Sequence, residues 1–401
     1  MLKEQTKNKW SIILLVVGIV FIASTLRSPL TAVGPIISYI RDGLAISNVL
    51  AGFITTIPLL AFAIISPFAP KISRRFGMEL TLFLSIILLA LGIVVRSLGT
   101  TSFLLIGTAL IGIAISFGNV LLPGLIKLKF PLHVGLMTAI FTVSMNLSGG
   151  IGAGFSYPIA NGTSFGWQGA LGFWAILAII AIIIWIPQLK NREQISETRK
   201  VPSLENQKSI LLSPLTWSIT LCMGLQSLIF YTTAAWIPAI LQSQGMDADK
   251  SGWMLSIMQF SQLPMTFIVP IIAGRLKDQR ILVAIYTVLY LIGFTGLLVG
   301  PATLSIVWMI SIGLAGGASF GLVMMFFSLR SRTSMQAAEL SGTAQSIGYL
   351  LAAVGPVFFG LFHDETGSWF FPIILFIVTA ILLFFSGMHA GRDRYVFSES
   401  K

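Results

Sequence analysis

The sequence predicts an all-α integral membrane protein with twelve transmembrane helices in two six-helix halves. Three observations lead there: the composition, the spacing of the apolar runs, and a repeat between the halves. Of the 401 residues, 55% are hydrophobic and only 10% are charged, whereas about a quarter of a soluble domain is charged. The net charge of +11 does not indicate a nucleic-acid partner, because the basic residues lie between apolar runs rather than on one soluble face.

The apolar runs are long enough to cross a bilayer, since a helical span needs about 20 apolar residues. Turn signals and charges separate them, for example "RDGLAIS" after the first run. The twelve predicted spans cover residues 11–39, 47–70, 79–97, 102–127, 133–159, 167–188, 212–240, 250–273, 281–299, 302–329, 338–362 and 369–389.

The longest polar stretch divides the chain almost in half. Its charge and lack of periodicity predict a flexible cytoplasmic linker at 189–211. The N-terminal six-helix half is expected at 1–188, and the C-terminal half with a short cytoplasmic tail at 212–401. The first apolar run has no small-residue cleavage site and continues as a full span, so we expect no cleaved signal peptide.

The distribution of basic residues predicts the orientation. If the N-terminus is cytoplasmic, 25 Lys and Arg residues all fall in inside segments except Arg27, Arg41, Arg96 and Lys250. Cytoplasmic loops carry an excess of such residues. We therefore expect a multi-pass protein of the plasma (inner) membrane with both termini in the cytoplasm.

The two halves resemble each other in sequence. "SFGNVLLPGLIKLK" (116–129) aligns with "SFGLVMMFFSLRSR" (319–332), so that Lys127 and Lys129 fall on Arg330 and Arg332. Parallel six-helix repeats are typical of alternating-access transporters. The sixth and twelfth spans are almost wholly apolar, which predicts that they face lipid.

One cation interrupts the first span. Arg27 lies deep in the run, and an arginine at the centre of a membrane helix costs about 2.5–3.5 kcal/mol to insert. All 14 acidic residues fall in loops, tails or span ends, with Glu339 and Asp278 nearest to the membrane. The counter-ion of Arg27 is therefore expected to be the substrate; a structural role, paired with helix carbonyls or a polar side chain, is the alternative. Pro29 is expected to bend the helix at this level.

Other polar residues inside the spans are expected to line a cavity. For Asn119 the alternative is a hydrogen bond that packs the bundle, and the same choice is open for the pairs Gln259–Gln262 and Gln345–Tyr349, which each share one helical face. Asn146 precedes "LSGGIGAG", whose small residues predict close helix packing. The predicted substrate-binding set is Arg27, Thr31, Asn119, Asn146, Gln226, Tyr231, Gln259, Gln262, Gln345 and Tyr349.

Taken together, these features resemble the major facilitator superfamily over the whole chain. "GRLKD" (274–278) is similar to the G-x-L-x-D of its loop motif, whereas the first copy has Pro70 and Arg74 where the glycine and the acid are expected. The resemblance implies that these loops govern the conformational change. The residues assigned to this motif are Arg74, Arg75, Gly77, Gly274, Asp278 and Arg280.

Longer phrases resemble one branch, the cyanate and nitroimidazole porters. They are "LRSPLTAVGP", "GNVLLPGLIKLKFP", "GWQGALGFWA", "LQSLIFYTTAAWIPAIL" and "AQSIGYLLAAVGP". The resemblance implies a secondary active transporter for a small anionic or polar solute.

Two other classes of function were weighed. A multidrug-type exporter of neutral or cationic compounds would be expected to hold a buried acidic residue. A membrane enzyme or sensor would need a catalytic constellation or an appended domain, and neither is visible. We expect no cofactor or metal, a lipid-embedded monomer, and a proton or counter-anion as a possible coupling partner.

Overall fold

Helices form every regular element in the part of the chain that the computed structural model describes, which is residues 2–46, 48–191 and 210–396. The predicted linker at 189–211 lies almost entirely outside these residues. Two compact units divide the chain: unit 1 comprises Met1–Leu125 with Ile140–Val201, and unit 2 comprises Ile126–Ala139 with Pro202–Lys401.

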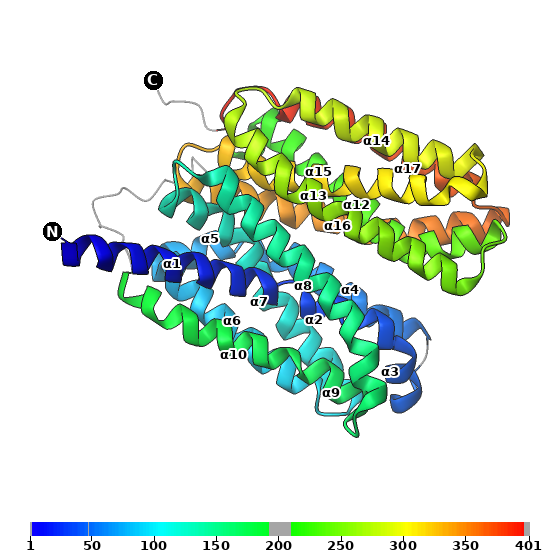
Figure 1. Cartoon of the computed structure of the whole chain (residues 1–401), viewed down its shortest axis with the longest axis horizontal. Helices are drawn as coiled ribbons and strands as arrows, with labels where there is room; N and C mark the ends of the chain where they lie inside the picture. The colour runs from blue at the N-terminus through cyan, green and yellow to red at the C-terminus, as the bar shows by residue number, and fades with distance from the viewer. Residues whose placement is uncertain (1, 47, 192–209, 397–401) are drawn as a thin grey trace. The chain divides into compact units, whose positions relative to one another are not determined.

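The elements follow the chain as coloured in Figure 1. Unit 1 holds α1 (Leu2–Thr25), α2 (Ser28–Thr31), η1 (Gly34–Ile36), α3 (Ile37–Leu44), α4 (Asn48–Ile65), α5 (Ala69–Phe76), α6 (Met78–Arg96), most of α7 (Thr101–Lys129) and of α8 (Val134–Gly162), α9 (Gly166–Gly172), α10 (Trp174–Trp185) and η2 (Ile186–Asn191). Unit 2 holds α12 (Pro214–Ser243), α13 (Ala248–Arg275), α14 (Arg280–Val299), η3 (Ala302–Leu304), α15 (Ser305–Leu329), α16 (Ser334–Thr366) and α17 (Phe370–Ala390).

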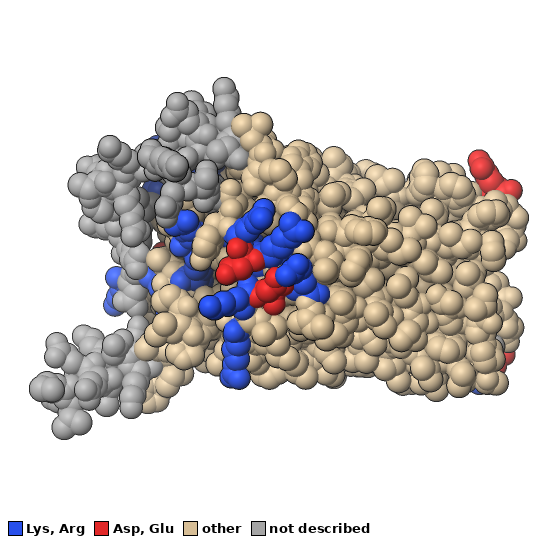
Figure 2. Space-filling model, turned by 90° about the horizontal axis from the view of Figure 1, so that it is seen from above, with Lys and Arg blue, Asp and Glu red and all other residues tan. Residues whose placement is uncertain are grey.

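The expectation of an all-α membrane protein is confirmed. Eleven helical segments of the described chain are long and apolar enough to cross a membrane, and the bent pair Phe53–Ile65 and Ala69–Phe76, at 59°, makes a twelfth when it is counted as one span. Most predicted span ends agree with the helices to within a few residues. Lys and Arg side chains gather toward one end of the face in Figure 2.

The first span, Ile12–Ile36, breaks at Leu26 and Arg27 between α1 and α2. One expectation about local structure was wrong. The segment "PKISRRFG" is not a loop: it forms α5, with Pro70 in the first turn and Arg74 and Arg75 in the last. Gly77 ends that helix at φ 84°, a backbone conformation that glycine adopts without a steric penalty.

In unit 1, α10 lies along α1 and α6 (Figure 1). Trp185 is fully buried and its indole donates to the Glu79 carbonyl at 3.0 Å, which joins α10 to α6. A Cβ on Gly18 would lie 2.7 Å from the Trp185 ring. The α1 backbone can therefore approach this ring only because position 18 is glycine.

In unit 2, close helix pairs depend on small residues in the same way. A Cβ on Gly313 or Gly317 of α15 would lie 2.2 or 2.1 Å from a carbonyl oxygen of α13. Gly224 of α12 and Gly348 of α16 meet likewise, since a Cβ on Gly224 would lie 3.2 Å from the Gly348 Cα. Close backbone approach through small residues is how membrane helices associate without a hydrophobic driving force.

Candidate functional site

A break in the first span places Arg27 outside regular helix. Arg27 precedes α2 with φ −120° and ψ −43°, and Pro29 stands in the first turn of that short helix. Proline has no N–H to donate and its ring crowds the carbonyl four residues earlier, which ends the preceding helix. The regular helix is interrupted at the level where Pro29 was expected to bend it.

Hydroxyl groups donate hydrogen bonds to the backbone carbonyls around the break. Ser28 Oγ and Ser148 Oγ both donate to the Ser24 carbonyl, at 3.0 and 2.8 Å. Thr31 Oγ1 donates to the Gly149 carbonyl at 2.7 Å, from α2 to α8. Backbone groups freed inside a membrane must find partners, and serine and threonine supply them here. Thr31 therefore has a structural contact beside its predicted binding role.

Two glycines of α8 make room for the broken segment. A Cβ on Gly149 would lie 2.6 Å from Arg27 Cγ, and one on Gly152 would lie 2.8 Å from the Ser28 carbonyl oxygen. The prediction that "LSGGIGAG" packs closely is confirmed. The half-buried side chain of Arg27 therefore packs against the α8 backbone at Gly149. Asn146 lies three residues before Gly149 and so shares this face of α8.

Asn119 lies on α7, next to the same break. It is 9% exposed, and a Cβ on the adjacent Gly118 would lie 2.5 Å from Leu26 Cδ2. Helix α7 therefore packs against the residue that precedes Arg27. Unit 1 gathers four predicted site residues, Arg27, Thr31, Asn119 and Asn146, around the α1–α2 break.

Sequence reasoning missed Arg96 in this region. We expected it only as an outside residue at the end of the third span, 79–97. It ends α6, is fully buried, and donates from Nη1 to the Pro29 carbonyl at 2.7 Å. The run "GIVVRSLGT" contained one signal, because its arginine directly follows three apolar residues, without a turn residue between them.

The C-terminal part of the predicted set lies on three helices of unit 2. Gln226 and Gln345 are both buried, and they flank the Gly224–Gly348 crossing of α12 and α16. Gln226 Nε2 donates to Ser227 Oγ and Gln345 Nε2 to Ser341 Oγ, each at 2.7 Å. Tyr349 is one turn after Gln345 and is also buried. The amides are thus oriented within their own helices.

The other pair lies on α13. Gln262 Nε2 donates to Gln259 Oε1, which confirms that the two side chains share a face. The Gln262 side chain also packs over Gly316 of α15. Tyr231 is half-buried on α12, with its ring edge-on to Phe230 at 5.1 Å between centroids.

Two acidic side chains are more buried than their positions in the sequence suggested. Glu79, the second residue of α6, is 3% exposed, and Glu339, inside the second turn of α16, is 9% exposed. Glu79 was expected only as the first residue of the third predicted span, 79–97. Two carboxylates at the ends of spans are therefore buried in the protein, which is the feature expected of a multidrug-type exporter.

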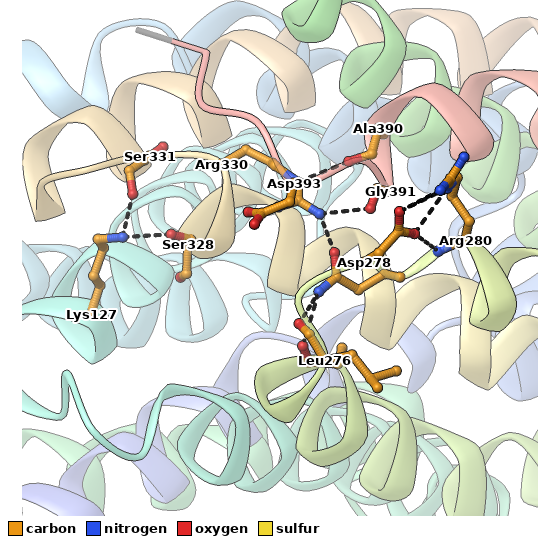
Figure 3. Close-up of polar contacts among 12 residues, drawn as sticks. Lys127, Leu276, Asp278, Arg280, Ser328, Arg330, Ser331, Ala390, Gly391 and Asp393 are labelled. Carbon is orange, nitrogen blue, oxygen red and sulfur yellow. Dashed lines mark hydrogen bonds and ion pairs between the residues drawn. The ribbon is translucent and has the colours of Figure 1, made fainter. Parts of the chain in front are cut away.

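The second copy of the loop motif forms a local ion pair (Figure 3). Asp278 contacts Arg280 Nη2 at 2.8 Å and accepts from the Arg280 backbone N–H at 2.9 Å, at the start of α14. The Arg280 side chain lowers the pKa of Asp278. Gly274 permits another contact of unit 2, because a Cβ there would lie 3.2 Å from the Gly135 Cα.

Beside this pair, Arg330 and Lys127 hold backbone carbonyls (Figure 3). Arg330 is 2% exposed and donates to Ala390 O and Gly391 O, at 2.9 Å each, and to Gln279 Oε1. Burial lowers the pKa of Arg330. Lys127 Nζ donates to Ser328 O at 2.6 Å and to Ser331 O. Both cations therefore lie at the carbonyl end of α15, where the helix dipole favours positive charge.

Comparison with known proteins agrees with this architecture. The Major Facilitator Superfamily profile matches residues 13–356. The chain is 48% identical over 388 residues to the "Uncharacterized transporter YycB" of Bacillus subtilis (strain 168), covering 96% of each protein. It is 38% identical over 387 residues to the 2-nitroimidazole transporter of Escherichia coli (strain K12), covering 96% of this chain and 97% of the relative.

A more distant relative and a solved structure extend the comparison. The cyanate transport protein CynX of Escherichia coli (strain K12) is 26% identical over 352 residues, covering 88% of this chain and 90% of the relative. The proton:xylose symporter XylE superposes with a TM-score of 0.75 over 94% of this chain and 95% of that chain, at 14% identity. The chain therefore belongs to the Major Facilitator Superfamily, in the branch that includes the 2-nitroimidazole transporter and CynX.

Proposed function

We propose that this protein is a secondary active transporter that carries a small anionic or polar solute, and that Arg27 contacts the solute. The observation that carries the proposal is the position of Arg27 at the α1–α2 break, with its side chain on the glycine face of α8. Discontinuous membrane helices, whose ends present charged or polar backbone groups, form the substrate sites of many secondary transporters. A guanidinium adds a fixed charge and five donors, which suits a small anion.

The proposal also assigns a solute-binding role to the amides of unit 2. Gln226, Gln259, Gln262 and Gln345 offer both donors and acceptors, which suits a polar heterocycle as well as an anion. Gln226 and Gln345 are hydrogen-bonded to neighbouring serines, and Gln262 is hydrogen-bonded to Gln259. These bonds fix the orientation of the amide groups. Tyr231 and Tyr349 would supply aromatic faces. In alternating access, the two halves would present these groups to each side of the membrane in turn.

The driving force follows from the charge of the solute. Bringing one negative charge in against an inside-negative potential costs about 2.3 kcal/mol per 100 mV. Uptake of an anion would therefore need a proton or a counter-anion, whereas export would not. The proposed setting is the plasma membrane, with both termini cytoplasmic and the protein a monomer; the excess of basic residues in the predicted inside segments supports that orientation.

Transport by purified protein in proteoliposomes tests the role of Arg27. Cyanate and 2-nitroimidazole are the probes, since the two relatives are named for them. Hydrogen bonds to a charged group contribute about 1.5–3 kcal/mol, so Arg27→Ala should lower transport at sub-saturating probe roughly 10- to 100-fold. Arg41→Ala is the control, because Arg41 is exposed and pairs with its neighbour Asp42 at 2.8 Å. Unchanged transport by Arg27→Ala would refute the proposal.

Buried Glu339 favours a second candidate, a multidrug-type exporter of neutral or cationic compounds. Such an exporter would use an acidic residue within the protein to bind a cation or to exchange a proton. If this candidate is right, the native protein carries no cyanate. Glu339→Gln would then abolish drug efflux from everted vesicles. Cyanate flux that survives in Glu339→Gln would exclude this candidate.

A further inference from the structure

We infer that Arg96 is a positioning residue for the solute site, acting through the Pro29 carbonyl rather than on the solute itself. The inference rests on the proposed function of Arg27. Pro29 stands between Arg27 and Thr31, two residues from each. Whatever fixes the Pro29 peptide therefore fixes the segment from which Arg27 extends.

The Pro29 carbonyl lacks its usual helical partner. In an uninterrupted helix it would accept from the N–H of Val33, four residues on. Here α2 ends at Thr31, and the Val33 N–H donates to the Leu30 carbonyl instead, at 3.4 Å. A buried carbonyl without a partner costs free energy comparable to a lost hydrogen bond. Arg96 Nη1 supplies the donor at 2.7 Å.

The backbone of Arg96 is itself held firmly. It ends α6, and a Cβ on Gly107 of α7 would lie 2.3 Å from the Arg96 nitrogen and 2.6 Å from its Cα. One turn earlier, a Cβ on Gly92 would lie 3.0 Å from the Ile111 nitrogen of α7. The α6–α7 contact therefore fixes the point from which the guanidinium reaches α2.

The hydrogen bonding of the guanidinium is concentrated on this one contact. Arg96 is fully buried, and within the described ranges its Nε and Nη2 have no hydrogen-bond partner. A buried charge is costly unless it is hydrogen-bonded. A purely structural arginine would be expected to use more of its five donors. We assign to Arg96 the task of holding the break in the geometry that presents Arg27.

Transport kinetics in proteoliposomes, with cyanate and 2-nitroimidazole as probes, test the inference. Arg96→Met keeps the length of the side chain but removes the donor and the charge. It should raise the KM of whichever probe is carried at least about fivefold, with a smaller change in maximal rate. Arg96→Lys keeps one donor able to reach Pro29 and should recover most of the native KM. A KM that Arg96→Met leaves within twofold of native overturns the inference.

A double-mutant cycle separates positioning from general stability. Pro29→Ala restores an N–H at position 29 and removes the cause of the break. If Arg96 acts through this peptide, Pro29→Ala and Arg96→Met should have effects on KM that are not additive, since contacting residues couple. Additive effects would overturn the inference, because a general loss of stability would change KM equally with and without Pro29.

Arg27→Ala in the same assay distinguishes the two failures. Loss of transport in Arg27→Ala with normal KM in Arg96→Met leaves the proposed function intact and refutes only the positioning role. Normal transport in Arg27→Ala refutes the proposed function, and the inference falls with it.

Discussion

Arg96 and Arg330 are two buried arginines at the ends of helices, and they are bonded very differently. Arg330 directly follows α15 and donates to Ala390 O, Gly391 O and Gln279 Oε1, with Asp393 at 3.9 Å. Arg96 ends α6 and donates to Pro29 O alone among the described residues. The first arginine joins three helices at one end of unit 2. The second holds a single peptide beside the residue proposed to bind the solute.

This difference shows how to tell a buried cation that stabilises the fold from one that positions a binding residue. A guanidinium that uses most of its donors on backbone carbonyls stabilises the fold, so its removal should lower the unfolding temperature. Removing a guanidinium that has one acceptor, at a helix break, should mainly change the transport kinetics. The predictions below test that division, beginning with the largest expected effect.

Arg330→Met should destabilise the protein most. Each buried acceptor left without a donor costs about 1–3 kcal/mol, and Gln279 Oε1 and two backbone carbonyls lose their donor together. Thermal unfolding in detergent measures the effect. Arg332→Met is the matched control, since Arg332 is exposed two residues away. Equal midpoints for the two variants would contradict a structural role for Arg330.

Gly152→Ala should have the next largest effect, and this change lies at the candidate solute site beside α2. Its Cβ would meet the Ser28 carbonyl oxygen and Thr31 Oγ1, both at 2.8 Å. The backbone contact cannot be relieved by a rotamer change, so overpacking should cost about 1–3 kcal/mol and displace α2.

The chain offers a control for this variant on the same helix. A Cβ on Gly154 meets nothing within 4 Å, so Gly154→Ala should keep native transport and native stability. Similar transport by the two alanine variants would show that α2 does not depend on close packing against α8.

Acidic pH should have the smallest effect, through Asp278. Arg280 lowers the pKa of Asp278 in the folded protein, so this pair stabilises the fold above the ordinary aspartate pKa of about 3.9. That stabilisation is lost as the pH falls through the lowered pKa. The side chains are 38% and 48% exposed, so the contribution should stay below about 1 kcal/mol.

Asp278→Asn provides the measurement for this pair. It should lower stability at neutral pH by less than about 1 kcal/mol, and it should flatten the loss of stability between about pH 5 and pH 3 by the same small amount. A steeper acid transition in Asp278→Asn than in the native protein would contradict the assignment of the lowered pKa to Arg280.

Hydropathy predicted the fold well because membrane spans are read from composition and length alone. The polar residues were harder to place. The same-face pairing of Gln259 and Gln262 followed from their spacing, whereas the burial of Arg96 and Arg330 depends on partners far along the chain. Pro29 predicted a bend, but the contacts of Thr31 with α8 and of Ser148 with α1 needed the structure. The binding roles of the predicted site residues stay predictions.

Ligand-induced thermal stabilisation tests the central claim most directly. A solute that binds only the folded state raises its stability by RT ln(1 + [L]/Kd), about 2.7 kcal/mol at 100 times Kd. The native protein should be stabilised by cyanate or by 2-nitroimidazole, and Arg27→Gln, although equally well folded without probe, should show little or no shift. Equal stabilisation of both proteins would show that the solute binds without Arg27 and would contradict the account.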